Sequence, residues 1–185
     1  MIRNITQFGP VFQIAFVARN FARSVKFWTE TMGVGPFFLY EHYPIDSGSF
    51  RGRPAVPLDL SIAIAYWGEM QVELVVPHDE QESTYREHLN LQRDGLVHHI
   101  GIAPEDKMKA ARFVEERGGQ LVQALNIASR RALYYELPGP GEGPILELAE
   151  ISPAFSADCD ELRRLSRGWN GLDPVQMPPS RRFGM

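Results

Sequence analysis

Residues 13–33 read QIAFVARNFARSVKFWTETMG, and residues 99–119 read HIGIAPEDKMKAARFVEERGG. The two stretches align without a gap at an offset of 99 − 13 = 86 positions, so that Gly33 aligns with Gly119. Apolar residues, helix-capping residues and glycines coincide along this alignment. A repeat of this kind indicates two structural units of the same design within one chain.

Each copy of the repeat predicts a strand followed by a helix. Residues 12–17 and 98–103 are short apolar runs of strand length. Asn20 and Asp106 then stand where a helix would begin, because their side-chain oxygens can accept hydrogen bonds from the free N–H groups of a first helical turn. A glycine follows each predicted helix, where glycine commonly ends helices.

Three further β-rich stretches follow each predicted helix. In order along the chain they are residues 35–40, 58–67, 70–76, 120–124, 132–137 and 144–149. The sequence therefore predicts an α+β fold in which a βαβββ module occurs twice, at about residues 11–77 and 96–151. We expect residues 1–151 to form one domain and residues 152–185 a C-terminal tail with a short helix, which packs across a partner subunit or frays.

The stretch between the predicted strands 35–40 and 58–67 has a distinct composition. Residues 41–57 are rich in Gly, Pro and Ser and are long for a mere connection. Two interpretations stay open, a loop that lies over a binding site and a flexible surface excursion.

Composition restricts the class of protein. The 185 residues are 44% hydrophobic, which is enough for one compact domain. A single cysteine, Cys159, excludes a disulfide framework and fits a reducing compartment, so we expect a cytoplasmic protein. The longest apolar stretch, residues 60–67, is too short to cross a bilayer, and the N-terminus has no secretory-signal pattern, so we expect no membrane association.

The charge pattern argues against nucleic acid as a partner. The net charge is −4, whereas phosphate binding needs a basic excess on one face. Arg51 with Arg53 and Arg130 with Arg131 form local basic pairs. Such pairs are either solvated loop charges or contacts for an anionic substrate at the rim of a cleft.

Four polar side chains stand in apolar strands at positions related by the repeat. Gln13 aligns with His99, and Glu73 in the strand MQVEL corresponds to Glu147 in PILEL. Because side chains alternate along a strand, Gln13 and His99 share a face with small residues, whereas His98 lies on the other face and is assigned a structural role. Each of these residues taken alone has an ordinary explanation, either a polar side chain that faces solvent or a hydrogen-bonded histidine of the core. Four related donors together predict a shared site.

These motifs resemble those of the vicinal oxygen chelate superfamily, which includes glyoxalase I, methylmalonyl-CoA epimerase, extradiol dioxygenases and bleomycin-resistance proteins. The resemblance covers roughly residues 12–151. It implies that the two modules form a curved, cup-like mixed sheet with flanking helices, that a small-molecule substrate binds in the cup, and that the protein is a homodimer. It also implies a divalent metal ion, Zn²⁺, Ni²⁺, Co²⁺, Mn²⁺ or Mg²⁺, held by Gln13, Glu73, His99 and Glu147.

The same resemblance implies a chemistry. A metal-dependent isomerase, epimerase or lyase would move a proton beside a metal-polarised carbonyl group of a small carbonyl or thioester substrate. Glu147 is expected to act as the base, and Glu73 to transfer a proton on the opposite face of the substrate.

The chain departs from individual branches of the superfamily. Val17 and Gly95 stand where arginines of glyoxalase I bind glutathione. Only Asp59 or Ser61 could supply the second catalytic carboxylate position of the epimerases. Gln13 replaces a histidine that the ferrous site of the dioxygenases needs. The resemblance therefore implies a class of mechanism without a named substrate.

The alternative is a metal-free binding module, like the resistance proteins of the superfamily, which sequesters a ligand in the cup. Aromatic side chains would then line the cleft. The candidates are Phe37, Phe38, Tyr40, Tyr43, Phe50, Tyr66 and Trp67.

Overall fold

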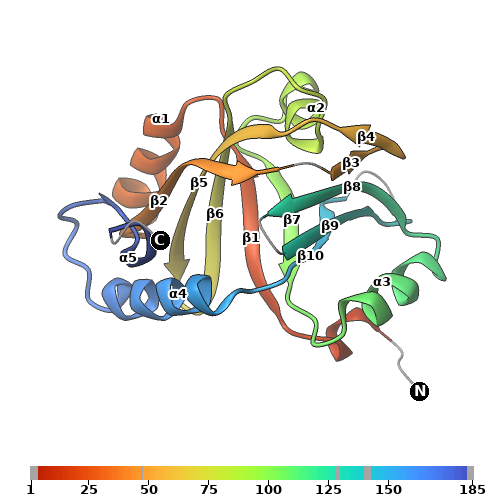
Figure 1. Ribbon diagram of the computed structural model, residues 1–185. Helices are drawn as coiled ribbons and strands as arrows, with labels where there is room; N and C mark the ends of the chain where they lie inside the picture. The colour runs from red at the N-terminus through yellow and green to blue at the C-terminus, as the bar shows by residue number, and fades with distance from the viewer. Residues whose placement is uncertain (1–3, 47, 128–129, 140–142, 183–185) are drawn as a thin grey trace.

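One curved, mixed sheet runs through the computed structural model, which describes residues 4–46, 48–127, 130–139 and 143–182 (Figure 1). Within these residues the sheet has eleven strands in the order β11-β2-β5-β6-β1-β7-β10-β9-β8-β3-β4. The predicted α+β class with a curved sheet is confirmed. β1 and β7, the first strands of the two repeats, are antiparallel neighbours at its centre, with Ala15 opposite His99.

The first half contains the elements that the first repeat predicts. They are β1 (Val11–Val17), α1 (Phe21–Lys26) continued by η2 (Phe27–Thr31), β2 (Phe37–Ile45), β5 (Leu58–Trp67) and β6 (Met70–Pro77). Asn20 caps α1 as predicted, because its Oδ1 accepts the Arg23 N–H at 2.9 Å. Ile14 and Phe16 of β1 pack under this helix against Trp28, which leaves Gln13 on the opposite face of the sheet.

The second half repeats the design. Its elements are β7 (Val97–Ile102), α3 (Lys107–Glu115), β8 (Gln120–Ile127), β9 (Arg130–Glu136) and β10 (Ile145–Leu148). Asp106 caps α3 by accepting the Lys109 N–H at 2.9 Å. Between the halves, α2 (Thr84–Asn90) follows a Ser83 cap, and η1 (Ile5–Gln7) precedes β1.

The stretch at residues 41–57 is more ordered than a loop. β2 continues to Ile45, and β3 (Gly48–Phe50) and β4 (Arg53–Ala55) form a hairpin. β3 pairs with β8 of the second half, with Gly48 opposite Leu125. A Cβ atom at Gly48 would lie 1.8 Å from the Ala124 carbonyl oxygen, so glycine permits this close approach. This segment therefore joins the two modules.

The C-terminal segment folds back on the sheet of its own chain. It contains α4 (Pro153–Ser166), β11 (Val175–Gln176) and α5 (Pro179–Arg182). The helix expected in this tail begins at Pro153, because Ser152 accepts the Phe155 N–H as an N-cap. β11 adds to the edge of β2. These elements are ordered and pack on their own chain, while the arm across a partner and the domain boundary at residue 151 stay predictions.

α1 and α4 lie on opposite faces of the first half (Figure 1). Ala63 and Ala65 of β5 pack on the α1 side. Ile64 and Tyr66, which alternate with them, pack against Leu162 of α4 on the concave side. α4 therefore fills the part of the cup that belongs to the first module.

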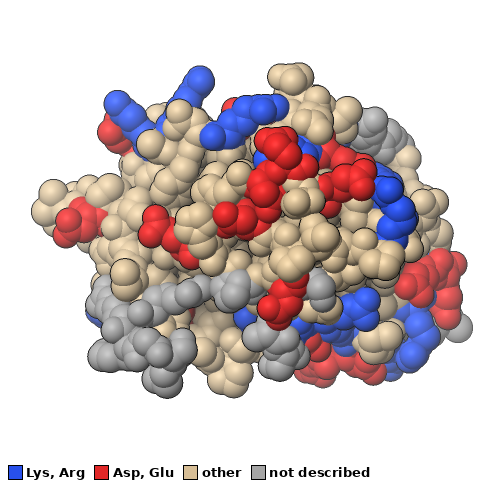
Figure 2. All heavy atoms as spheres, turned by 45° about the horizontal axis from the view of Figure 1, so that its top comes forward, with Lys and Arg blue, Asp and Glu red and all other residues tan. Residues whose placement is uncertain are grey.

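The surface fits the composition. Acidic and basic side chains lie side by side on the face drawn in Figure 2, in line with the net charge of −4. Among the described residues, none of the helices is long and apolar enough to cross a membrane.

Candidate metal centre

The four predicted donor residues meet at the centre of the sheet, on four neighbouring strands. Gln13 comes from β1, Glu73 from β6, His99 from β7 and Glu147 from β10. The Nε2 atom of His99 lies 3.2 Å from Oε2 of Glu73 and 3.2 Å from Oε2 of Glu147. It lies 3.3 Å from Oε1 of Gln13. All four side chains are buried, and the donor atoms converge on one region.

Gln13 is oriented by a neighbour that the sequence did not single out. Its Nε2 donates to Oε1 of Gln71 at 2.7 Å, so its own Oε1 turns toward His99. The Nε2 of Gln71 donates to the Tyr66 hydroxyl at 3.3 Å and to Sγ of Cys159 at 3.2 Å. Gln71 lies two residues before Glu73 and therefore on the same face of β6. This spacing could have identified Gln71 as a neighbour of the site from the sequence.

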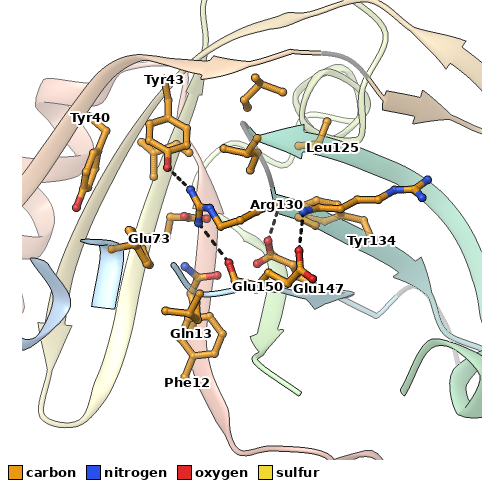
Figure 3. Close-up of a pocket in the computed structure, with 18 of the residues that line it drawn as sticks. Phe12, Gln13, Tyr40, Tyr43, Glu73, Leu125, Arg130, Tyr134, Glu147 and Glu150 are labelled. Carbon is orange, nitrogen blue, oxygen red and sulfur yellow. Dashed lines mark hydrogen bonds between the residues drawn. The ribbon is translucent and has the colours of Figure 1, made fainter. Parts of the chain in front are cut away.

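Tyr134 lies beside Glu147 (Figure 3) and holds its carboxylate, and Tyr85 in turn contacts Tyr134. The Tyr134 hydroxyl donates to Oε1 of Glu147 at 2.9 Å, and the Tyr85 hydroxyl donates to Tyr134 at 2.9 Å. Burial and the charge of Glu147 raise the pKa of Tyr134 well above its usual range, so this phenol stays a donor. Sequence analysis missed both tyrosines, because neither belongs to the repeated strand-and-helix stretch.

His98 contacts the donor set, because the pairing of β1 with β7 is irregular at this residue and strict alternation of side chains does not hold there. Its Nδ1 lies 2.8 Å from Nδ1 of His99, and its ring stacks on Tyr85 with centroids 4.9 Å apart. Burial, followed by the charges of His99 and His88, holds the pKa of His98 well below its usual range. A hydrogen bond between two Nδ1 atoms needs one donor and one acceptor. When Nε2 of His99 serves as a ligand, His99 donates through Nδ1 and neutral His98 accepts.

The charges of the cluster are unbalanced without a cation. Burial raises the pKa of Glu73, the hydrogen bond and charge of His99 lower it, and the charge of Glu147 raises it again, with a net upward shift. Burial lowers the pKa of His99, but Glu147 and Glu73 outweigh this effect and raise it to about 9. At neutral pH this shift favours a protonated imidazole between the two carboxyl groups. With neutral His99 the two carboxylates carry two negative charges, which a divalent ion would balance.

The chemistry of the donor set fits such an ion. Three oxygens and one imidazole nitrogen suit the divalent ions named above, and the two carboxylates supply the compensating charge. The residues present therefore fit the metal that the resemblance implies.

A pocket opens from this cluster into the cup. Its walls are mostly apolar and include Phe12, Ile45, Ile62, Leu125, Ile127 and Phe155, and Gln13, Glu73 and Glu147 also line it. Arg130 and Arg131 lie at the pocket as well. Nη2 of Arg130 donates to the Tyr43 hydroxyl at 2.8 Å, and Nη1 donates to the Glu150 carbonyl oxygen at 3.2 Å (Figure 3).

Other candidates from the sequence lie elsewhere. Asp59 is bonded to His42, and Ser61 to His78, so neither faces the pocket. Of the seven aromatic residues proposed for the cleft, Tyr40 and Tyr43 line this pocket, and the others do not. The basic pair Arg51 and Arg53 forms ion pairs with glutamates away from it.

Solved structures with a similar fold include methylmalonyl-CoA epimerases. The one from Mycobacterium tuberculosis is 18% identical, with a TM-score of 0.53 over 80% of this chain and 91% of that chain. A Streptomyces coelicolor variant in complex with 2-nitronate-propionyl-CoA is 16% identical, with a TM-score of 0.55 over 79% and 96%. A hypothetical protein from Bacillus halodurans C-125 is 18% identical, with a TM-score of 0.54 over 78% and 95%. At these identities the likeness shows the fold.

The family comparison rests on the sequence itself. No curated protein matches the chain significantly. The model of the glyoxalase/bleomycin resistance protein/dioxygenase superfamily matches residues 12–134, which is most of the chain and includes both β1 and β7. The predicted family is confirmed, and the chain belongs to the glyoxalase/bleomycin resistance protein/dioxygenase superfamily.

Proposed function

We propose that this protein is a divalent-metal-dependent enzyme that transfers a proton beside the carbonyl group of a small substrate, as an isomerase, epimerase or lyase. The observation that supports it most is the meeting of Gln13, Glu73, His99 and Glu147 at a pocket that opens into the cup. These four residues would hold the ion. When bound, the ion would supply Lewis acidity toward a carbonyl oxygen.

The residues of the chain account for the movement of the proton. Glu147 would take the proton from the carbon beside the carbonyl, and Tyr134 would keep its carboxylate oriented through the 2.9 Å hydrogen bond. Glu73 lies on the other flank of His99 and would return a proton on the opposite face. Its raised pKa suits this exchange, because an acid is most effective when its pKa approaches the working pH.

The pocket also supports a class of substrate. Its apolar walls fit a small organic body, and the guanidinium of Arg130 fits an anionic group at the mouth. A structure of similar fold, with a TM-score of 0.54, is of methylmalonyl-CoA epimerase with methylmalonyl-CoA. Acyl thioesters are therefore the first substrates to test. The same proposal includes a homodimer in the cytoplasm, which analytical ultracentrifugation and cell fractionation would test.

The test combines elemental analysis of the purified protein with α-proton exchange in deuterated water, over a panel of acyl thioesters and hydroxyketones. The wild-type protein should carry a divalent metal and exchange at least one substrate. Glu147→Gln should lose exchange while keeping its fold. Glu116→Gln is the matched control, because Glu116 is an exposed residue at the end of α3. Metal-free protein, together with unchanged exchange by Glu147→Gln, would refute the proposal.

The alternative from the sequence, a metal-free binding module, has one observation in its favour. With its pKa at about 9, His99 can pair as an imidazolium with both Glu73 and Glu147 without any metal ion. Ligand binding that a chelator does not change, without turnover, would favour this alternative over the enzyme.

A further inference from the structure

A second group of metal-capable side chains lies outside the pocket. His42 comes from β2, Asp59 from β5, and His78 directly follows β6. On β5 the neighbours of Asp59, Leu58 and Leu60, are buried in the core. Because side chains alternate along a strand, Asp59 lies on the opposite face of the sheet, away from the candidate metal centre. This outer cluster is therefore a separate feature of the molecule.

The three side chains are already in mutual contact. Nδ1 of His42 lies 2.6 Å from Oδ1 of Asp59, and the rings of His42 and His78 are 4.7 Å apart between centroids. One ligand atom from each residue lies within 4.8 Å of the other two. Nε2 of His78 is 2.7 Å from Oγ of Ser61, and the His78 N–H donates to the Asp59 carbonyl oxygen at 2.8 Å.

An irregularity of β2 is what brings His42 to this place. The pairing of β2 with β5 shifts register between Tyr40 and Tyr43, and His42 has a φ of 45°. A residue other than glycine in this left-handed region costs energy and requires a compensating contact. The His42 N–H finds one in Oγ of Ser61 at 3.2 Å. Bulges of this kind redirect a side chain, and here the imidazole turns onto Asp59.

The composition of the cluster points to a cation of the zinc class. Two imidazoles and one carboxylate suit Zn²⁺ or Cu²⁺, whereas Mg²⁺ and Ca²⁺ prefer oxygen ligands alone. In a tetrahedral zinc site the ligand atoms are about 3.3 Å apart, as bonds of about 2.0–2.1 Å require. The present separations are within 4.8 Å. The side chains of His42 and Asp59 are 69% and 44% exposed, so small rotations can close the difference.

We propose that His42, Asp59 and His78 form a second metal site, for a Zn²⁺-class divalent ion, on the outer face of the sheet. The ion would tie the bulge of β2 to β5 and to the end of β6. Tyr43 follows His42 directly and accepts a hydrogen bond from Arg130 at the mouth of the pocket. The site therefore braces one wall of that mouth from outside.

The test counts zinc in protein that has been stripped with a chelator and dialysed against Zn²⁺. His42→Asn and His78→Ala each remove one ligand, and asparagine tolerates the left-handed backbone of position 42. Each variant should bind one zinc equivalent fewer than the wild type. Glu80→Gln is the matched control, because Glu80 is an exposed carboxylate two residues from His78 that pairs with Arg86. It should bind as much zinc as the wild type.

A Glu147→Gln background separates this site from the candidate metal centre. There the remaining zinc should disappear when His78→Ala is added, and the imidazole nitrogen resonances of His42 and His78 should shift on zinc addition. Far-ultraviolet circular dichroism verifies that each variant is folded. Equal zinc stoichiometry in the wild type, His42→Asn and His78→Ala would overturn the proposal, as would an equal loss in Glu80→Gln.

Discussion

Metal-free protein should lose stability as the pH rises from 6.5 to 9. The pKa of His99 is raised from its ordinary 6.5 to about 9 by Glu147 and Glu73, against the opposing effect of burial. Because the folded state binds the His99 proton more tightly, this proton contributes its full stabilisation below pH 6.5. The contribution to the unfolding free energy is lost as the pH rises through about 9. The pKa of Glu73 is also raised, so its ionisation acts in the same direction. Stability should therefore fall continuously over this range.

The size of the effect follows from the shift of His99. At about 1.4 kcal/mol for each pH unit, the difference between 6.5 and about 9 corresponds to about 3 kcal/mol of unfolding free energy. For a chain of this length, that loss lowers the melting temperature by roughly 6–12 °C. Zinc should reverse the trend, because a ligand imidazole must first lose its proton, and the apparent affinity then rises as the pH approaches 9.

Urea unfolding followed by tryptophan fluorescence measures both trends, with chelator or with Zn²⁺ at fixed concentration. The His78→Ala background keeps the proposed outer site out of the measurement. His99→Gln should remove the part of the pH dependence that the imidazole contributes and leave the part due to Glu73. A constant unfolding free energy of the metal-free protein between pH 6.5 and 9 would refute the hypothesis that protonated His99 pairs with Glu73 and Glu147. Parallel slopes with and without zinc would refute the proposed ligand role of His99.

Three further substitutions test the surroundings of the candidate centre. His98→Leu should lower zinc affinity about 10–100-fold, because it removes the acceptor that fixes the ligand imidazole, and competition with a chromophoric chelator measures this. Gly101→Ala should also weaken zinc binding with unchanged circular dichroism, because its Cβ would lie 2.8 Å from Oε1 of Gln13; unchanged affinity would contradict the role of that oxygen. Asp158→Ala should cost about 1–3 kcal/mol in urea unfolding, since the buried Tyr40 hydroxyl loses its acceptor at 2.8 Å, and a smaller loss would mean that water replaces it.

The fold was predictable from the repeat. The alignment of its two copies indicates which residues face the same side of the sheet, as well as which segments form strands and helices. Two copies of one strand, paired antiparallel at the centre, place equivalent side chains on the same face. The amino-acid sequence alone therefore assigns Gln13 and His99 to one side of the sheet, and Glu73 and Glu147 follow from the corresponding later strands. The same alternation predicted His98 on the other face, but the pairing of β1 with β7 is irregular at this residue, and the two imidazoles contact each other through their Nδ1 atoms.

The contacts that orient these donors were not predictable in this way. The carboxylate of Glu147 depends on Tyr134 and Tyr85, which come from β9 and α2 and meet only in the folded chain. At the repeat offset of 86, Tyr134 would align with Gly48, so the repeat gave no signal for it. The hairpin of β3 and β4 escaped prediction for a similar reason, because its Gly- and Pro-rich sequence is typical of turns and its pairing with β8 is long-range.

The C-terminal helix α4 has an apolar face that can be recognised in the sequence, and the structure packs this face against the sheet beside the pocket. Phe155, Cys159 and Leu162 of α4 have the spacing of one helical face, and they pack on the concave side of the first module. Phe155 also lines the pocket. An apolar stripe of this kind needs a surface to pack against, and the concave side of the first module supplies it. The pocket that remains is lined by Gln13, Glu73 and Glu147 of β1, β6 and β10 as well as by Phe155, so α4 shapes the cavity from which a substrate would reach the proposed centre.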